Sequence, residues 1–458
     1  MIFKAYDIRG TVPDQLDANM AYRIGRASAR FLTAGELVVG RDARVSSPEL
    51  GDALIRGIAD EGVDVIDIGR VSTPMVYYAV DRLETGGGVM VTASHNSAEY
   101  NGFKICRENA IPVGEASGLR EIEALVATIA AESPEPVGGS LRGSTRDRDV
   151  ATEYAEHALR VVDKAPSARL KVAIDCGNGM AAVGLEPVLE HLDLEVERLY
   201  FEPDGSFPNH DANPLEVENL ADLCEAVRRT GSDFGVAFDG DGDRAVFVDE
   251  TGRPISSDLV AAVLARRQLE RSPGGKVLYD LRSSRAVAEE IEAAGGIAEM
   301  CRVGHSFIKA HMRESGAIFA GELSGHFYFR FSSSLIADDA VAAFVAMLDL
   351  LSAEGRPISE ILDPLRRYSA SGEINTRVPD VDAILREVES QHADAPEILH
   401  LDGLLVRYER WWFSLRPSNT EPVLRLNLEA DTDELMVSER DRLLREIERI
   451  GAAGGSQG

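Results

Sequence analysis

Three segments of this 458-residue chain share one sequence pattern, and this repeat constrains the fold more than any other feature. In each segment a short apolar run ends at an aspartate and continues into a polar turn. A helical pattern and a second apolar run follow. The first runs and their turns lie at 37–42, 171–179 and 276–284. Each interval has the length of a strand–helix–strand unit with parallel strands, so we predict three similar α/β domains rather than one large sheet.

Changes in composition divide the chain further. At roughly 150 residues per domain, the length predicts three or four domains. Residues 130–149 are rich in Gly, Pro and Ser, and 249–258 form a turn. Beyond 365–380 the pattern changes to long strands and one closing helix. The predicted domains are domain I at 1–148, domain II at 149–248, domain III at 249–366 and domain IV at 367–458.

The formal net charge of −29 excludes some classes of partner. Nucleic acids and anionic membranes need a basic protein face, so neither is expected as a main partner. The basic residues are six lysines and 42 arginines. An acidic, Lys-poor surface fits solubility at high salt, but GC-rich coding also depletes lysine.

The cysteines and apolar runs indicate the compartment. The four cysteines lie far apart and form no CxxC pair, which argues against a disulfide framework or a zinc site. The N-terminus has no secretory apolar region, and no apolar run approaches the ~18 residues that span a bilayer. The run at 340–348 is predicted to be a short buried helix. We therefore expect a cytoplasmic protein.

Residues 86–105 place a serine hydroxyl at the end of a predicted strand. An apolar run that begins with three glycines ends at a polar turn with Ser94 at its centre. A hydroxyl there, surrounded by backbone amides, can accept a phosphoryl group. A serine in this place can also simply cap the next element. His95, Asn96 and Lys104 nearby favour the chemical interpretation without deciding it.

Residues 233–250 place three aspartates at alternate positions on a glycine-containing turn between two apolar strands. Asp239, Asp241 and Asp243 repel one another unless a cation neutralises them, and carboxylate oxygens select Mg²⁺ or Ca²⁺. A solvated acidic loop is disfavoured by the glycines and the apolar flanks. An EF-hand is disfavoured because Arg244 stands where its loop needs glycine and because the flanks resemble strands. A Mg²⁺ site with open coordination positions is therefore predicted.

Two further turns have the composition of sugar or anion sites. GELSGH (321–326) presents polar side chains at alternate positions, which suits sugar hydroxyls. RPSNTEP (416–422) presents guanidinium, hydroxyl and amide donors that could surround a phosphate. Each sequence alone is more typical of a plain turn, but their occurrence together with the serine and aspartate loops favours sites. The candidates are Glu322, Ser324, His326, Arg416, Ser418, Asn419 and Thr420.

Taken in order, TASHN with YNGFK, DGDGDR, GELSGH and RPSNTEP resemble the four signature loops of the α-D-phosphohexomutase family. The chain is most similar to the phosphomannomutase/phosphoglucomutase branch of that family. YDIRG (6–10), LRSSRA (281–286) and VGHSFIK (303–309) also match, so the resemblance covers essentially the whole chain. One departure is Ser97, where the family usually has proline, and this change removes no chemical group.

The resemblance implies a four-domain α/β architecture around a central cleft. Three related α/β domains would carry the phosphoserine, metal and sugar-binding loops. A C-terminal α+β domain of the TATA-binding-protein type would carry the phosphate-binding loop. The implied enzyme is an isomerase of carbohydrate metabolism that interconverts hexose 1-phosphate and hexose 6-phosphate, with mannose or glucose as the sugar. Hexose 1,6-bisphosphate would be its intermediate and activator.

The resemblance also implies roles for individual residues. Ser94 would be carried as phosphoserine, with Mg²⁺ held by its phosphate and by Asp239, Asp241 and Asp243. Arg9 and Arg244 would stabilise the phosphoryl group. Lys104 and His326 would act as general acid and base. The implied substrate-binding residues are Glu322, Ser324, His326, His305, Arg282, Arg416, Ser418, Asn419 and Thr420.

Alternatives remain open at this point. Phosphoglucosamine mutase is the main rival within the family, although YNGFK and Leu323 look more like the mannose/glucose branch. A Mg²⁺-dependent sugar phosphatase and a non-catalytic sugar-phosphate-binding protein are more remote. The expected partner is a hexose phosphate, bound by a monomer or homodimer. A hinge near 365–380 would let domain IV close over the substrate.

Overall fold

The three repeated segments each form a strand–helix–strand unit in the computed structural model, which describes residues 2–131, 142–164, 168–417 and 423–454. In every unit the two strands pair in parallel, as predicted. The units are β2 (Glu36–Arg41), α2 (Ser47–Asp60) and β3 (Asp64–Arg70); β7 (Leu170–Asp175), α6 (Ala181–Leu189) and β8 (Leu194–Leu199); β11 (Lys276–Asp280), α9 (Arg285–Ala293) and β12 (Ile297–Cys301).

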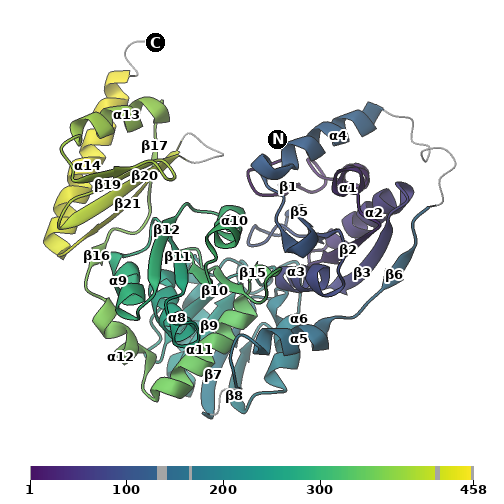
Figure 1. Cartoon of the computed structure of the whole chain (residues 1–458), viewed down its shortest axis with the longest axis horizontal. Coiled ribbons are helices and arrows are strands. Elements are labelled where there is room, and N and C mark those ends of the chain that lie inside the picture. Colours follow the sequence, from purple (N-terminus) through teal and green to yellow (C-terminus); the bar gives the residue numbers. More distant parts are fainter. Residues whose placement is uncertain (1, 132–141, 165–167, 418–422, 455–458) are drawn as a thin grey trace.

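The first unit belongs to a six-stranded sheet with the order β1-β5-β4-β2-β3-β6. Its strands β4 and β5 are antiparallel, and the connection between them carries the predicted serine turn. Helices α1 and α2 pack against each other beside the sheet (Figure 1). The added elements are β1 (Ile8–Thr11), α1 (Ala18–Leu32), α3 (Thr73–Arg82), β4 (Gly87–Val91), β5 (Tyr100–Arg107), α4 (Leu119–Ala131) and β6 (Thr145–Asp147).

The second unit lies in a four-stranded sheet with the order β10-β9-β7-β8. Strands β9 and β10 are antiparallel and fully buried, because apolar residues fill both of their faces. The connection between them is the predicted metal loop. The added elements are α5 (Ala151–Leu159), α7 (Ala221–Thr230), β9 (Phe234–Phe238) and β10 (Ala245–Asp249).

The third unit lies in a five-stranded sheet with the order β12-β11-β13-β14-β15. Strands β13 and β14 are antiparallel, and the turn between them is the predicted sugar-binding loop. The added elements are α8 (Ser257–Arg271), α10 (His305–Ser315), β13 (Phe319–Gly321), β14 (Phe327–Arg330), β15 (Ile336–Asp338), α11 (Ala340–Glu354) and α12 (Ile358–Leu362).

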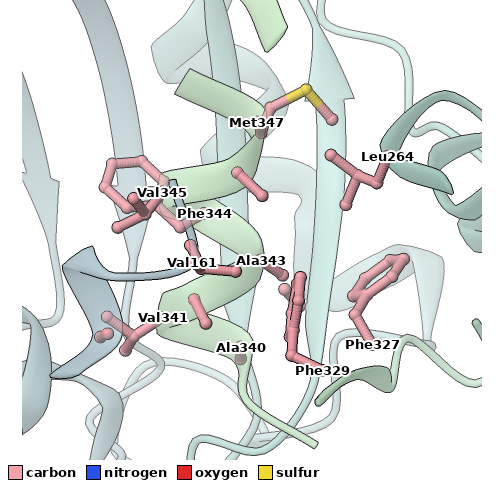
Figure 2. Packing of buried hydrophobic residues seen from close by; sticks show 14 of the residues in the cluster. Val161, Leu264, Phe327, Phe329, Ala340, Val341, Ala343, Phe344, Val345 and Met347 are labelled. Atoms are coloured by element: carbon pink, nitrogen blue, oxygen red, sulfur yellow. The ribbon is translucent and has the colours of Figure 1, made fainter. Parts of the chain in front are cut away.

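Helix α11 lies at the centre of an apolar core that the first three domains share. The predicted buried helix at 340–348 is confirmed, since residues 340–351 of α11 are all buried. Figure 2 shows Phe344 and Met347 on this helix among side chains from other elements, including Leu264 of α8 and Phe329 of β14. The same cluster reaches Val38 in β2. The packing therefore makes one continuous body of domains I to III.

Domain IV is a separate α+β unit, as predicted. Its antiparallel sheet has the order β16-β21-β20-β19-β18, with β17 also paired to β21, and its apolar cluster is its own. Figure 1 shows it projecting from the body beyond α12 and β16. Its elements are β16 (Ser369–Ala370), β17 (Ile374–Arg377), α13 (Val381–Gln391), β18 (Glu397–Leu399), β19 (Leu404–Arg407), β20 (Trp411–Pro417), β21 (Val423–Ala430) and α14 (Asp433–Gly454).

The domain boundaries after residues 148, 248 and 366 stay predictions, and we use them below as names for the four parts. Within the described residues, no helix is both long and apolar enough to cross a membrane.

Candidate active site

Ser94 lies on a tight turn between the antiparallel strands β4 and β5. Its backbone φ of 53° is in the left-handed region, which costs a non-glycine residue roughly 1–2 kcal/mol. The residue is buried, and its Oγ lies 3.0 Å from Oδ2 of Asp239 and 3.2 Å from Nδ1 of His95. Backbone strain of this kind clusters at functional sites. The turn therefore holds the predicted nucleophile directly against the aspartate loop.

The aspartate loop joins β9 to β10 and gathers three buried carboxylates. Asp239, Asp241 and Asp243 are at most 1% exposed, and one oxygen from each lies within 4.8 Å of the other two. Burial, together with the other two carboxylates, raises the pKa of Asp239 to about 8. The strands on either side rule out the helical flanks of an EF-hand. Such crowding of negative charge is relieved by a cation.

The loop also has the oxygen atoms that a hard cation requires. Oδ1 of Asp241 and Oδ1 of Asp243 are buried and have no hydrogen-bond partner among the described residues. An unpaired carboxylate oxygen in the interior costs free energy, and coordination to a metal removes that cost. A set of ligands made only of oxygens fits Mg²⁺ better than a softer metal.

Lys104 extends from β5 into the same loop. Its Nζ lies 2.6 Å from Oδ2 of Asp241 and 2.5 Å from Oδ2 of Asp243. Burial disfavours the charged form, but the two carboxylates outweigh it and raise the pKa of Lys104. The ammonium therefore stays protonated at neutral pH and suits a donor rather than a base. Thr73, at the start of α3, donates to Asp241 at 2.6 Å and fixes that carboxylate further.

His326 and Arg244 meet beside the aspartate loop. Nε of Arg244 donates to Nε2 of His326 at 3.0 Å and lies 3.8 Å from Oδ2 of Asp239. Nδ1 of His326 lies 3.2 Å from Oδ2 of Asp338 and 3.7 Å from Oδ1 of Asp243. Burial opposes a positive imidazole, but these carboxylates outweigh it and raise the pKa of His326. A histidine with a raised pKa suits proton exchange near neutral pH.

Asp338 connects His326 to a buried lysine. Nζ of Lys309 lies 2.7 Å from Oδ1 of Asp338, and neither side chain is exposed. The same Nζ lies 4.1 Å from the ring centre of Tyr77 in domain I. Removing one partner from a buried ion pair costs roughly 3–5 kcal/mol, so the pair holds Asp338 firmly behind His326.

The candidate sugar-binding residues of domain III form one cluster. Glu322 accepts a hydrogen bond from the hydroxyl of Tyr328 at 2.7 Å, and a guanidinium nitrogen of Arg282 lies 3.3 Å from it. Asp280 holds Arg282 through contacts of 3.1 and 2.9 Å. Oγ of Ser324 is buried and has no hydrogen-bond partner in the described part of the chain. The cluster thus offers acceptors and donors for sugar hydroxyls.

His305 and Arg9 lie at the edges of the same region. The His305 ring stacks on that of His326, with centroids 6.3 Å apart. Arg9 donates from Nη1 to Oδ1 of Asn96 in the serine turn at 2.6 Å, and it is paired with Asp7 at 2.7 Å. The structure therefore brings the predicted residues of domains I, II and III into one connected group.

Arg416 lies on β20 of domain IV and is held by carboxylates. Its Nε lies 3.0 Å from Asp402 and its Nη1 lies 3.4 Å from Glu373. Glu373 also lies 4.0 Å from Arg282, so it connects domains III and IV. An incoming phosphate would compete with these two carboxylates for the guanidinium. The other predicted residues of this loop, which lie outside the described residues, are Ser418, Asn419 and Thr420.

Asp280, Asp338 and Thr73 are among the residues of the site that were not predicted from the sequence. Asp280 ends one of the repeated strands, so the repeat itself was a signal for it. Thr73 carries no local signal, because it acts on Asp241, 168 positions away. Asp338 was missed because its contact with His326 depends on how β14 and β15 lie beside each other.

Comparison with known proteins agrees with this geometry. Family models described as phosphoglucomutase/phosphomannomutase match four consecutive parts of the chain. The α/β/α domains I, II and III match residues 1–133, 152–252 and 256–368, and the C-terminal domain matches 373–446.

Similar proteins match over nearly their full length. A protein of Xanthomonas campestris pv. campestris named "Phosphohexose mutases" is 41% identical over 98% of this chain and 99% of its own. The phosphomannomutase/phosphoglucomutase of Pseudomonas aeruginosa is 40% identical over 94% of this chain and 92% of its own. A crystal structure of a phosphoglucomutase/phosphomannomutase family protein from Burkholderia thailandensis superimposes with a TM-score of 0.89. It is 33% identical and covers 98% of this chain and 97% of its own.

Proposed function

Because this chain belongs to the phosphoglucomutase/phosphomannomutase family and is a hexose phosphate mutase, we propose that it interconverts the 1- and 6-phosphates of mannose and glucose through a phosphoserine at Ser94. The intermediate is a hexose 1,6-bisphosphate, which also activates the unphosphorylated enzyme. The protein acts as a monomer or homodimer. Two sugars are proposed because mannose and glucose differ in the orientation of one hydroxyl, and because similar proteins bear both names.

One observation carries the proposal. The Ser94 hydroxyl is buried, lies on a strained turn and is 3.0 Å from a carboxylate of a three-aspartate loop. A serine that only caps an element needs neither the strain nor the carboxylates. Phosphoryl transfer needs both a positioned oxygen and concentrated charge around it.

In the first half-reaction, the phosphoryl group moves from Ser94 to the free hydroxyl of a hexose monophosphate. The bond between phosphorus and the serine oxygen breaks, and a bond to the sugar oxygen forms. His326 accepts the proton of the attacking hydroxyl, since its raised pKa suits proton uptake. A proton returns to the oxygen of Ser94, and the protonated Lys104 beside the aspartate loop is the donor.

In the second half-reaction, the bisphosphate presents its other phosphate to Ser94. The serine oxygen attacks the phosphorus and returns its proton to Lys104, while the bond between phosphorus and the hexose oxygen breaks and that oxygen takes the proton held by His326. Phosphoserine is restored. Arg244 and Arg9 stabilise the transferred group, because their guanidinium groups flank the serine turn and the aspartate loop. Reversal of the sugar between the two steps converts a 1-phosphate into a 6-phosphate.

Mg²⁺ would be held by Asp239, Asp241 and Asp243 together with the phosphate on Ser94. When bound, it would neutralise the charge that develops on the transferred phosphoryl group. The free Oδ1 atoms of Asp241 and Asp243 support this assignment.

The sugar and its fixed phosphate lie between domains III and IV in this proposal. Glu322 and Ser324 bind sugar hydroxyls, and His305 and Arg282 add contacts from domain III. The non-reacting phosphate is held by Arg416, Ser418, Asn419 and Thr420.

The test is a coupled assay of glucose, mannose and glucosamine 1-phosphates with Mg²⁺ and glucose 1,6-bisphosphate. We expect conversion of the glucose and mannose phosphates with little release of inorganic phosphate, and the label from [³²P]glucose 1,6-bisphosphate on Ser94. A preference for glucosamine 1-phosphate would instead favour phosphoglucosamine mutase. Steady phosphate release would point to a phosphatase, and absence of turnover would point to a binding protein.

A further inference from the structure

The aspartate that ends each repeated strand organises the turn behind it in the same way. Oδ1 of Asp42, Asp175 and Asp280 accepts a hydrogen bond from the backbone N–H two residues later, at 3.0, 2.8 and 2.7 Å. In domains I and III that later residue is an arginine, Arg44 or Arg282, which also pairs with the same aspartate. The repeat therefore places an aspartate-bound guanidinium at an equivalent point of two domains.

The two arginines contact different groups. Arg282 is directed at Glu322 in the candidate sugar site. Arg44 is 1% exposed and lies beneath the serine turn, where all five of its N–H donors are used. Nε bonds to Asp42 at 3.1 Å, and the other four hydrogens bond to backbone carbonyls of the turn. These are the carbonyls of Ser94 (2.8 Å), Asn96 (2.5 Å), Ser97 (2.6 Å) and Tyr100 (2.9 Å).

The turn needs these bonds because it lies between the ladders of β4 and β5. Strand β4 ends at Val91 and β5 begins at Tyr100, and although the N–H of Thr92 still donates to the carbonyl of Gly102, residues 93–98 belong to neither strand. The left-handed conformation of Ser94 adds strain. Buried carbonyls without a partner cost roughly 1–3 kcal/mol each, so a guanidinium that bonds to four of them stabilises this one conformation.

Domain II covers both the arginine and the turn. The guanidinium carbon of Arg44 lies 5.2 Å from the ring centre of Phe207. A Cβ on Gly205 would be 2.2 Å from the Cα of Arg44, and a Cβ on Gly240 of the metal loop would be 2.6 Å from the carbonyl oxygen of Ser94. These close approaches leave little room for the turn to move relative to the metal loop.

We propose that Arg44 is a positioning residue for phosphoryl transfer: by bonding to four carbonyls of the serine turn, it sets the Ser94 hydroxyl against the metal loop. This inference rests on the proposed phosphoserine mechanism. Arg44 acts through the backbone and does not touch substrate. Its loss should therefore slow transfer to and from Ser94 without weakening the binding of hexose phosphate.

The test compares Arg44→Lys with Arg26→Lys. Lysine keeps the charge at position 44 but cannot bond to four carbonyls. Arg26 is a matched control because it is an equally buried arginine of domain I, bonded to Glu61. Each protein is first emptied of phosphate by excess glucose 6-phosphate. The rate of ³²P transfer from glucose 1,6-bisphosphate to Ser94 is then measured, together with kcat, KM and Tm.

We expect Arg44→Lys to lower the labelling rate and kcat about a hundredfold, the size of effect that roughly 1 Å of misplacement causes, with KM within about threefold of wild type. Arg26→Lys should lower Tm without changing the labelling rate of the folded protein. In Arg44→Ala, added guanidinium ion should restore part of the labelling rate and should not do so in Arg26→Ala.

Other outcomes distinguish a failure of the role of Arg44 from a failure of the phosphoserine mechanism. Labelling of Arg44→Lys at the wild-type rate, or an equal loss in Arg26→Lys, would overturn the role of Arg44 while leaving the phosphoserine in place. Wild-type protein that takes no label on Ser94 would overturn the phosphoserine mechanism and this inference with it. If Arg44→Lys does not fold, Asp42→Asn tests the same point, because it loosens Arg44 and should lower kcat about tenfold at unchanged KM. An unchanged kcat in Asp42→Asn would count against the proposal.

Discussion

Domains I to III and domain IV are held in place by different forces. A single apolar cluster runs through the first three domains around α11, whereas the cluster of domain IV is separate. Polar contacts connect domain IV to domain III. Arg285 bonds to Glu429 and Asp431, Arg302 pairs with Asp402, and Arg282 lies near Glu373.

This difference suits domains I to III and domain IV to different functions. Buried apolar area is costly to expose, so the serine turn, metal loop and Lys104 keep a fixed relation to one another. Partly exposed ion pairs contribute roughly 0–1 kcal/mol each and can exchange partners. The hinge predicted near 365–380 needs a correction, because residues 369–370 and 374–377 are strands of the domain IV sheet, which leaves only the residues just before Ser369 for a hinge. We expect domain IV to change its position about those residues without disturbing the reaction centre. The body positions the chemistry, and domain IV is suited to capture substrate.

The largest expected effect comes from the body. Ser94→Ala should reduce the mutase rate by about a thousandfold or more, since loss of a nucleophile has effects of this size or larger. The coupled assay measures the rate, and Ser97→Ala in the same turn is the matched control, with little expected loss. Conversion by Ser94→Ala at a tenth or more of the wild-type rate would contradict the phosphoserine mechanism.

Removal of metal should have the next largest effect on the rate. This effect should be confined to the body formed by domains I to III. A chelator is expected to lower the rate about a hundredfold, because the charge that develops on the transferred phosphoryl group is then not neutralised by a metal, and added Mg²⁺ should restore the rate. The only two tryptophans, Trp411 and Trp412, lie in domain IV, so their fluorescence reports on that domain. It should not change on chelation. Full activity in chelator would contradict the metal site, and a large fluorescence change would show that the metal also affects domain IV.

A smaller effect is expected at the junction with domain IV. Arg285→Ala removes the contacts to Glu429 and Asp431, and Glu429 also accepts from Nε1 of Trp412 at 2.9 Å. We expect KM to rise about three- to tenfold and the Trp412 emission to shift, with kcat little changed. Arg267→Ala, which removes an ion pair to Asp349 within domain III, should leave both unchanged. Equal effects of the two variants would show that KM and the Trp412 emission do not depend specifically on the contacts between domains III and IV.

The smallest expected effects concern the pH dependence of the unfolding free energy. A rise in pH should destabilise the body through one buried group and stabilise domain IV through another. Burial raises the pKa of Asp339, at the start of α11, to about 7 from 3.8. The folded body therefore holds a proton that the unfolded chain releases, so this contribution is present below about pH 4 and is lost as the pH rises to about 7. Asp339→Asn should flatten the fall in unfolding free energy over this range, as measured by urea titration at several pH values.

In domain IV the histidine His392 is buried, and burial lowers its pKa below 6.5. Its contribution to stability is present above pH 6.5 and is lost as the pH falls through the lowered value, because the unfolded chain then binds a proton first. Tryptophan fluorescence during acid titration measures this. His392→Gln should make the unfolding of domain IV less sensitive to acid, and an unchanged profile would contradict the assignment.

The repeated units, the buried helix and the chemical character of the loops could be predicted from the sequence alone. Strands and helices follow local apolar periodicity, which is why β2, β7 and β11 could be predicted with their helices. The aspartate loop could be predicted because three alternating carboxylates have few other uses. These features depend only on neighbours in the chain.

The contacts between side chains of the site, in contrast, depend on the tertiary structure. Lys104 lies 137 positions from Asp241, and Lys309 reaches Asp338 from another element of domain III. Arg44 was not singled out in the sequence, yet its guanidinium bonds to four carbonyls some 50 positions away. Periodicity says which face of a strand is buried, but it does not say against what. Contacts between domains depend on how those faces pack, and the packing is what joined separate motifs into one site.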